Sequence, residues 1–277
     1  MILIADGGST KTNWCLTDGS TSTYFDSEGY NPYFVNTTFI VSSLEKSLPE
    51  ALNGSSVSAV HFYGAGCTKD KAPVVQQALR QVFSEACCFV ESDLLGAARA
   101  LLGDQPGFAA ILGTGTNTGL FDGNGIAFQI DSLGFIMGDE GSGGYLGKKM
   151  LGDYIRNVMP SELRLTFDAT FQLPPQELIS RIYTQPLPNR FCASFAPFIR
   201  EHIRHPYMHQ LVRESFGEFF NRLVRRYPDY QARSFNCVGS VAWFFADTLR
   251  EIAAEYEMNT GRIMQSPIDG LAGYHFR

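Results

Sequence analysis

The chain has 277 residues and a formal net charge of −6, with 44% hydrophobic and 18% charged residues. This length and composition predict a globular protein of one or two domains, and the negative charge without a run of like charges argues against nucleic-acid binding. No apolar stretch reaches the roughly 18–20 residues of a membrane span, and six cysteines without CxxC spacing favour reduced thiols in a cytoplasmic protein.

Residues 1–19, MILIADGGSTKTNWCLTDG, predict a strand, a glycine-rich turn and a second strand. The turn is not a P-loop, because threonine rather than glycine precedes Lys11 and Thr12, and no helix follows. The residues after the turn are β-branched or aromatic, and Asp18-Gly19 is a turn signal. Asp6 also comes too early for the apolar region of a signal peptide.

The next segments alternate between buried strands and amphipathic helices. Strands are predicted at 59–66 (AVHFYGAG) and 87–93 (CCFVESD), and helices at 74–86 and 94–102. The glycine and proline residues of 103–108 indicate a domain boundary. We therefore predict an α/β chain with an N-terminal domain, residues 1–106, and a C-terminal domain, residues 107–277, whose last helix (266–275) returns to the first domain.

Residues 109–125, AAILGTGTNTGLFDGNG, repeat the pattern of the N-terminus: an apolar strand, a Gly/Thr turn, a second strand and an Asp-Gly turn. This self-similarity predicts two related domains that face each other, each with a glycine turn. Backbone N–H groups in such turns form concave anion sites, so two turns can clamp a polyphosphate. Either stretch alone also fits an ordinary hairpin.

The segment 133–151 is a glycine-dense loop that runs into a helix. Asp139 and Glu140 lie in this loop between apolar flanks. They are either functional carboxylates or, together with Ser142, part of the start of the helix.

Two later segments differ in what they predict. The apolar stripe within 213–227 predicts core packing of a helix. Residues 234–252 predict a strand, a turn at Gly239-Ser240 and an amphipathic helix. A flat base or ribose can lie against the backbone of such a turn.

Six motifs together carry a family resemblance. They are DGGSTKT (6–12), GYNPYF (29–34), ESD (91–93), GTGTN (113–117), GDEGS (138–142) and VGSVAWFF (238–245). In this order and spacing they resemble the BadF/BadG/BcrA/BcrD ATPase family, and within it the N-acetylglucosamine kinase-like members of the actin/hexokinase/Hsp70 superfamily. The resemblance covers essentially the whole chain. It implies two ribonuclease-H-like (actin-like ATPase) domains, with Mg²⁺, ATP and the acceptor in the cleft between them.

The resemblance implies an ATP-dependent carbohydrate kinase that phosphorylates an amino sugar, with the 6-hydroxyl of N-acetylglucosamine as the expected acceptor. The phosphate loops would be Gly8, Ser9, Thr10 and Lys11, and Thr114, Gly115 and Thr116. Gly239 and Ser240 would line the adenosine pocket, Asn31, Asn117 and Asp139 would bind the sugar, Asp93 would be the catalytic base, and Asp6 would lie near Mg²⁺ and its waters. One departure leaves the identity of the sugar open: kinases for N-acetylglucosamine often carry an aromatic residue just before GDEGS, whereas this chain has Ser132-Leu133 and then Phe135.

The chemistry of phosphoryl transfer supports these roles independently. It requires alignment, charge neutralisation and a carboxylate that accepts the hydroxyl proton. Asp93 follows a predicted strand, where α/β folds present residues to ligands. The alternative is that Asp93 only caps the following helix. Short polar side chains such as Asn31, Asn117 and Asp139 suit several sugar hydroxyl groups.

Three other interpretations start from different residues. His202, His205 and His209 could hold a metal on one helical face, but Pro206 interrupts that helix, which favours solvated histidines. Some relatives activate 2-hydroxyacyl-CoA dehydratases through a bridging iron–sulfur cluster held by cysteines, but neither Cys67 nor Cys237 lies in a cluster motif.

A non-catalytic ATP- or sugar-binding regulator is the third. Regulators with a sugar-kinase fold typically add a DNA-binding segment, whereas this chain begins directly with its first strand. We expect a sugar as the small-molecule partner, a homodimer, and no nucleic-acid or membrane partner.

Overall fold

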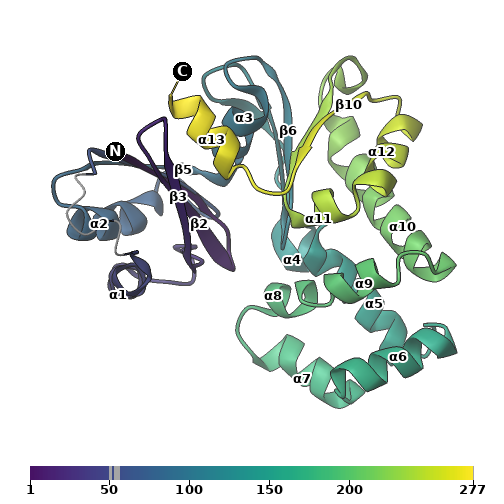
Figure 1. The fold of residues 1–277 in the computed structure, drawn as a ribbon. Helices are drawn as coiled ribbons and strands as arrows, with labels where there is room; N and C mark the ends of the chain where they lie inside the picture. The colour runs from purple at the N-terminus through teal and green to yellow at the C-terminus, as the bar shows by residue number, and fades with distance from the viewer. Residues whose placement is uncertain (50–51, 53–56, 277) are drawn as a thin grey trace. The chain divides into compact units, whose positions relative to one another are not determined.

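The computed structural model describes residues 1–49, 52 and 57–276 and divides into two compact units (Figure 1). Unit 1 comprises residues 1–109, 119–128 and 266–277, and unit 2 comprises residues 110–118 and 129–265. The described chain contains two five-stranded sheets with helices between their strands, so the predicted α/β class is confirmed. The division into functional domains at residues 106 and 107 stays a prediction.

The first sheet has the strand order β3-β2-β1-β4-β5. Its strands are β1 (Ile2–Gly7), β2 (Lys11–Thr17), β3 (Ser22–Glu28), β4 (Ala59–Gly64) and β5 (Cys87–Ser92). Strands β1 to β3 form an antiparallel meander, and β4 and β5 run parallel to β1. Parallel neighbours need crossover connections, and helices supply them.

Helices cover both faces of the first sheet (Figure 1). They are α1 (Thr37–Ser47), α2 (Ala72–Val82), α3 (Asp93–Leu102) and α13 (Ile268–His275). Alternate strand residues such as Leu3, Trp14 and Phe62 pack with α1 and α2 in one apolar core. The opposite face carries α3 and α13, and α13 packs against α3.

The strands and helices predicted between residues 59 and 102 are confirmed. Helix α2 begins earlier than expected, because Pro73 is suited to the first turn of a helix, where its missing N–H is not needed. It also ends earlier, with Phe83 as the C-cap.

The second sheet has the order β10-β9-β6-β7-β8. Its strands are β6 (Gly107–Leu112), β7 (Thr116–Phe121), β8 (Ile126–Gln129), β9 (Phe235–Val238) and β10 (Thr260–Met264). Strand β9 runs parallel to both β6 and β10. Read from β8, this order repeats that of the first sheet, in which β6 corresponds to β1 and β7 to β2. The strand order thus agrees with the repeat seen in the sequence.

The remaining helices belong to unit 2. They are α4 (Gly134–Met137), α5 (Gly143–Ile155), α6 (Ser161–Phe171), α7 (Pro175–Thr184), α8 (Pro188–Ala193), α9 (Ala196–Glu201), α10 (Pro206–Arg222), α11 (Ser240–Phe244) and α12 (Ala246–Glu255), with short 3-10 turns at Val224–Arg226 and Tyr230–Ala232. The predicted core stripe is confirmed, since Phe216, Phe219 and Phe220 of α10 are fully buried. Within the described residues, no helix combines the length and the apolar character needed to cross a bilayer.

Candidate functional site

The first glycine turn joins β1 to β2 in unit 1. The N–H of Gly8 donates to the carbonyl oxygen of Lys11 (2.9 Å), and the N–H of Gly29 donates to that of Thr10 (3.2 Å). A Cβ at Gly29 would lie 2.5 Å from the carbonyl oxygen of Ser9. Only glycine permits the backbone at residue 29 to lie this close to Ser9, so the chain directly after β3 packs against the turn.

Asn31 lies against the same turn. Its Nδ2 donates to Oγ of Ser9 (3.3 Å), and its Oδ1 accepts from the backbone N–H of Tyr33 (3.0 Å). The side chain is buried, and a Cβ at Gly66 would lie 2.4 Å from its Oδ1. The structure therefore brings the predicted sugar ligand Asn31 together with the predicted phosphate loop.

Lys11 forms an ion pair that its motif did not indicate. Its Nζ lies 2.8 Å from Oδ2 of Asp26 on β3. The two residues are diagonal neighbours, because Lys11 pairs with Glu28 and Asn13 pairs with Asp26 in the β2–β3 register. Phosphate binding by Lys11 stays a prediction, and it would require the ammonium group to exchange this half-exposed carboxylate for a phosphate oxygen.

Two carboxylates lie at the same edge of the first sheet. Asp6 is near the end of β1, and Asp93 directly follows β5. The register aligns Gly7 with Gly64 and Gly64 with Ser92, so these strands end in one row. Burial, together with the charge of Asp93, raises the pKa of Asp6 to about 6, although hydrogen bonds from Asn13 and Ser266 oppose the shift.

Asp93 is the first residue of α3 but not its N-cap. Oγ of Ser92 accepts from the N–H of Leu95 (3.2 Å), which makes Ser92 the cap. Oδ1 of Asp93 accepts from the N–H of Leu94 (2.7 Å). Its carboxylate thus lies in the first turn, where the helix dipole favours negative charge. The alternative that Asp93 caps the helix is therefore wrong, because Ser92 is the N-cap.

The second glycine turn joins β6 to β7 and is tied to the start of α5. The N–H groups of Gly143 and Gly144 donate to the carbonyl oxygens of Gly113 (2.8 Å) and Thr114 (3.0 Å). In a trans peptide the C=O and the following N–H point in opposite directions. The N–H groups of Thr114 and Gly115 therefore point away from α5 as two adjacent donors, an arrangement that suits an anion.

Asp139 is bound to this turn. Its Oδ1 accepts from the N–H of Thr116 (3.1 Å), while Oγ1 of Thr116 donates to the carbonyl oxygen of Glu140 (2.8 Å). Asp139 is buried and has a left-handed φ of 58°. Burial raises its pKa. A Cβ at Gly115 would lie 3.0 Å from Oδ2 of Asp139, so the carboxylate leaves little room there for a larger residue.

Two further predicted site residues are Asn117, which forms a hydrogen bond, and Gly239, which is closely packed. Oδ1 of Asn117 on β7 accepts from Nε2 of Gln129 (2.8 Å) at the end of β8. Gly239 has a φ of 124°, and a Cβ there would lie 2.3 Å from the carbonyl oxygen of Leu112. Glycine is thus required where β9 turns into α11.

A cavity of about 180 Å³ in unit 2 adjoins the second turn. It is lined by Gly113, Thr114, Gly143, Ala193, Ala196, Pro197, Arg200, Ser240, Val241, Phe244 and Phe245. The structure thus brings Ser240 and Thr114 to one cavity. Gly239 packs against the backbone of Leu112 next to this cavity.

Two side chains of this cavity, Arg200 and Phe244, were not among the predicted site residues. The guanidinium of Arg200 on α9 lies over the ring of Phe244 on α11, 3.8 Å from its centroid. A flat heterocycle can lie beside such a pair. Phe244 belongs to the motif VGSVAWFF and could have been found there, whereas Arg200 lies in a segment without a motif.

Two of the three histidines, His202 and His205, make local hydrogen bonds. Pro206 begins α10, and Nδ1 of His205 accepts from the N–H of Tyr207 (3.1 Å) as its N-cap. Nε2 of His205 also lies 3.0 Å from Glu162, and Nδ1 of His202 lies 3.0 Å from the carbonyl oxygen of Phe198. Across the described part of the chain, no group of three or more His, Cys, Asp or Glu side chains is arranged to hold a metal.

Solved structures share this fold over the full chain length. A putative N-acetylglucosamine kinase from Porphyromonas gingivalis has 40% sequence identity and a TM-score of 0.95, and the match covers 100% of this chain and 99% of that one. A putative N-acetylglucosamine kinase from Chromobacterium violaceum has 18% identity and a TM-score of 0.72, with 99% of each chain covered.

A third likeness is more distant. A ROK family glucokinase from Streptomyces griseus, in complex with glucose and AMPPNP, has 14% identity and a TM-score of 0.63, with 99% of this chain and 97% of that chain covered. The second and third likenesses concern the fold alone, because a fold can host many functions. No family model matches the chain, and no match to a curated protein was found.

Proposed function

We propose that this chain, which belongs to the N-acetylglucosamine kinase-like family of the actin/hexokinase/Hsp70 superfamily, is an ATP-dependent sugar kinase. Its proposed reaction transfers the γ-phosphoryl group of ATP to the 6-hydroxyl of N-acetylglucosamine or a close amino sugar. The Porphyromonas gingivalis protein, at 40% identity over nearly its whole length, supports this substrate class.

The observation that carries the proposal is the cavity beside the second glycine turn in unit 2. Thr114 and Ser240 line it together, so a nucleoside in this cavity would have its phosphates next to the N–H donors of Thr114 and Gly115. The ring of the base would lie near Arg200 and Phe244. In unit 1, the turn at Gly8, Ser9 and Thr10 is proposed as the second support for the phosphates.

Asp6 suits the neighbourhood of a magnesium ion. A half-buried carboxylate near a second carboxylate gains from a nearby cation, as its raised pKa indicates. Mg²⁺ typically needs only one or two carboxylates, because water and phosphate oxygens complete its shell. Asp6 would hold the ion through water. When bound with ATP, Mg²⁺ would neutralise charge on the phosphates.

Asp93 is proposed as the base that activates the acceptor. Its carboxylate would accept the proton of the sugar hydroxyl while the oxygen forms its bond to the γ-phosphorus and the bond to ADP breaks. Asn31, Asn117 and Asp139 are proposed to orient the sugar ring.

The dehydratase-activator alternative is less well supported by the cysteines. An iron–sulfur cluster is held by thiolates. Burial raises the pKa of the Cys67 thiol to about 12 and also raises that of Cys237. Both are buried, which favours a packing role for these thiols.

The proposal is tested with purified protein, ATP and a panel of amino sugars and hexoses, followed by steady-state kinetics of Asp93→Asn on the best sugar. General-base assistance is worth about 10²–10⁴-fold, so kcat should fall by that factor. The sugar KM should change far less, because the base acts mainly in the transition state.

Asp70→Asn is the matched control, since Asp70 is a surface residue bonded to Thr68. This variant should keep the parental kcat. Near-parental turnover of Asp93→Asn would show that Asp93 is not the base, and absence of sugar-dependent ATP consumption in the parent would contradict the kinase itself.

A further inference from the structure

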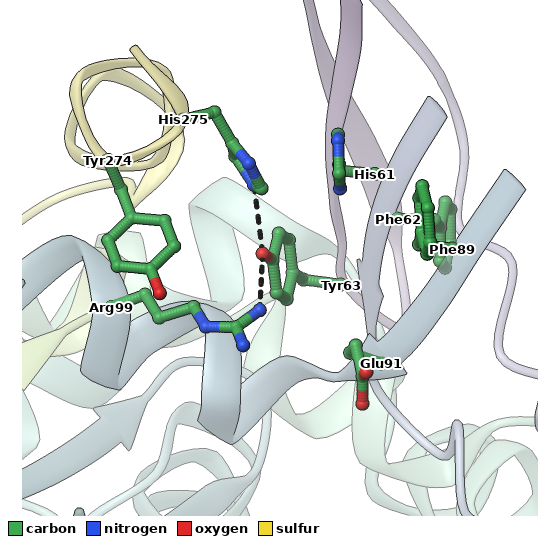
Figure 2. A pocket seen from close by; sticks show the side chains of 8 residues that line it. All are labelled: His61, Phe62, Tyr63, Phe89, Glu91, Arg99, Tyr274 and His275. Atoms are coloured by element: carbon green, nitrogen blue, oxygen red, sulfur yellow. Dashed lines mark hydrogen bonds between the residues drawn. The ribbon is translucent and has the colours of Figure 1, made fainter. Parts of the chain in front are cut away.

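A separate cavity of about 270 Å³ lies within unit 1, on the sheet face covered by α3 and α13 (Figure 2). Its walls include His61 and Tyr63 of β4, Phe89 of β5, Arg99 of α3, and Tyr274 and His275 of α13. None of these residues has a role in the proposed kinase reaction.

The alternation of strand residues builds this cavity. Val60, Phe62 and Cys88 belong to the apolar core on the other face. The intervening residues His61, Tyr63 and Phe89 therefore point to the α3 and α13 side. His61 and Phe89 are cross-strand partners, and their rings stack with centroids 4.9 Å apart.

Arg99 brings a positive charge into these aromatic walls. Its Nη1 donates to the hydroxyl of Tyr63 (2.8 Å), and its guanidinium lies 5.7 and 5.2 Å from the ring centroids of Tyr63 and Tyr274. Its Nε is buried and has no hydrogen-bond partner among the described residues. Arg99 also forms none of the ion pairs found in the described part of the chain.

Two histidines complete the cavity in their neutral form. The ring centroids of His61 and His275 are 3.9 Å apart, and Nε2 of His275 lies 2.9 Å from the hydroxyl of Tyr63 (Figure 2). Burial, followed by the charges of His61 and Arg99, lowers the pKa of His275 to about 4. Burial and the charge of Arg99 also lower the pKa of His61.

We propose that this cavity binds a small oxyanion, a carboxylate or a phosphate, through the guanidinium of Arg99. Among the described residues, the guanidinium donates to one acceptor, the hydroxyl of Tyr63, and an anion in the cavity would accept from the N–H groups of Nη2. The planar guanidinium matches carboxylate and phosphate oxygens in pairs. The rings of Tyr274 and Phe89 make the walls apolar, so a carboxylate on a flat ring fits this surface.

The affinity of the cavity for the anion should depend on pH. The titratable and charged groups of the cavity are His61 and Tyr63 on β4, Glu91 on β5, Arg99 on α3, and Tyr274 and His275 on α13. An anion that neutralises Arg99 removes one of the charges that oppose protonation of the histidines. Their pKa values should rise on binding, and affinity should increase as pH falls from 7 toward 5.

The first test is calorimetric titration of the protein with benzoate, inorganic phosphate and, as a neutral isostere, benzyl alcohol. Arg99→Met keeps the apolar stem but removes the donors. It should weaken benzoate binding by about tenfold or more, the loss expected for charge-assisted hydrogen bonds. Arg80→Met, on the exposed side of α2, should bind like the parent. Tighter binding of phosphate than of benzoate, lost in Arg99→Met, would assign the site to phosphates.

The second test needs no variant that could fail to fold. Histidine ring resonances of the parent are followed by NMR during the same titrations. Benzoate or phosphate should shift His61 and His275 and raise the pKa of His275, while His202, His205 and His209 stay unchanged. Because phosphate could also bind a glycine turn, only these local shifts count. Unchanged His61 and His275 at saturating anion, or equal binding of benzyl alcohol and benzoate, would overturn the proposal. Both readouts are independent of kinase activity.

Discussion

At the residue scale, Asp6 shows how the candidate site differs from an ordinary core. Asp6 is half-buried near Asp93, and desolvation together with the charge of Asp93 raises its pKa from 3.8 to about 6. Between these two values the folded state binds more protons than the unfolded state, so stability falls as pH rises through this window. Above about pH 6 the folded protein carries the full cost of the buried charge.

Asp6→Asn should therefore stabilise the protein without ligands. At pH 7–8 we expect the free energy of unfolding to rise by on the order of 1–3 kcal/mol, with little change near pH 4. Denaturant unfolding across pH 4–8 measures this. Asp26→Asn, a surface carboxylate on the same sheet, should retain the parental pH profile. A destabilised Asp6→Asn at pH 7–8 would mean that the charge is favourably held in the free protein.

Some contacts of single residues could be predicted from the sequence, and others could not. The proximity of Asn31 to the first turn agrees with its motif, and so does the position of Asp139 beside the second. The ion pair between Lys11 and Asp26 depends on the β2–β3 register, which no phosphate motif contains. Arg200 reaches its cavity only because α9 packs near α11, a contact between segments distant in the chain.

At the element scale, the second glycine turn is a unit with α5 and Asp139. Its carbonyls are held by Gly143 and Gly144, and its Thr116 by Asp139. Strands β4 and β5, helices α2 and α3 and the buried stripe of α10 followed from hydrophobic periodicity. The single turn α4 did not, because it lacks a repeat and is held by tertiary bonds such as that from Nζ of Lys148 to the carbonyl oxygen of Phe135 (2.7 Å).

A side chain at Gly115 should disable this turn. In Gly115→Val the added atoms would meet the carboxylate of Asp139, which must shift and carry Thr116 with it. Mg-ATP at 100 times its Kd stabilises a binding protein by about 2.7 kcal/mol. We expect the corresponding rise in Tm in the parent and its loss in Gly115→Val, with the apo fold retained by circular dichroism.

The matched control is Gly125→Ala, because a Cβ at Gly125 meets no atom within 4 Å. This variant should keep the full nucleotide-dependent shift in Tm. A parental shift in Gly115→Val would remove the second turn from the nucleotide site and leave the cavity beside it without its proposed phosphate contact.

At the scale of the whole molecule, two sheets share one strand order, and each has a glycine turn after its first strand. The weak repeat between residues 7–19 and 113–123 was visible in the sequence because both segments have a glycine turn between two apolar strands and end in an Asp-Gly turn. The helices of unit 2 between α5 and α10 have no counterpart in that repeat, so only the fold itself could reveal them.

The central claim, phosphoryl transfer from ATP to a sugar, is tested most directly by following ATP and N-acetylglucosamine with the parental protein by phosphorus NMR. We expect a sugar monophosphate resonance, coupled to the protons at C6, that grows in equal amount with ADP and requires Mg²⁺. Release of inorganic phosphate alone, with no sugar phosphate from N-acetylglucosamine or any sugar of the panel, would contradict it.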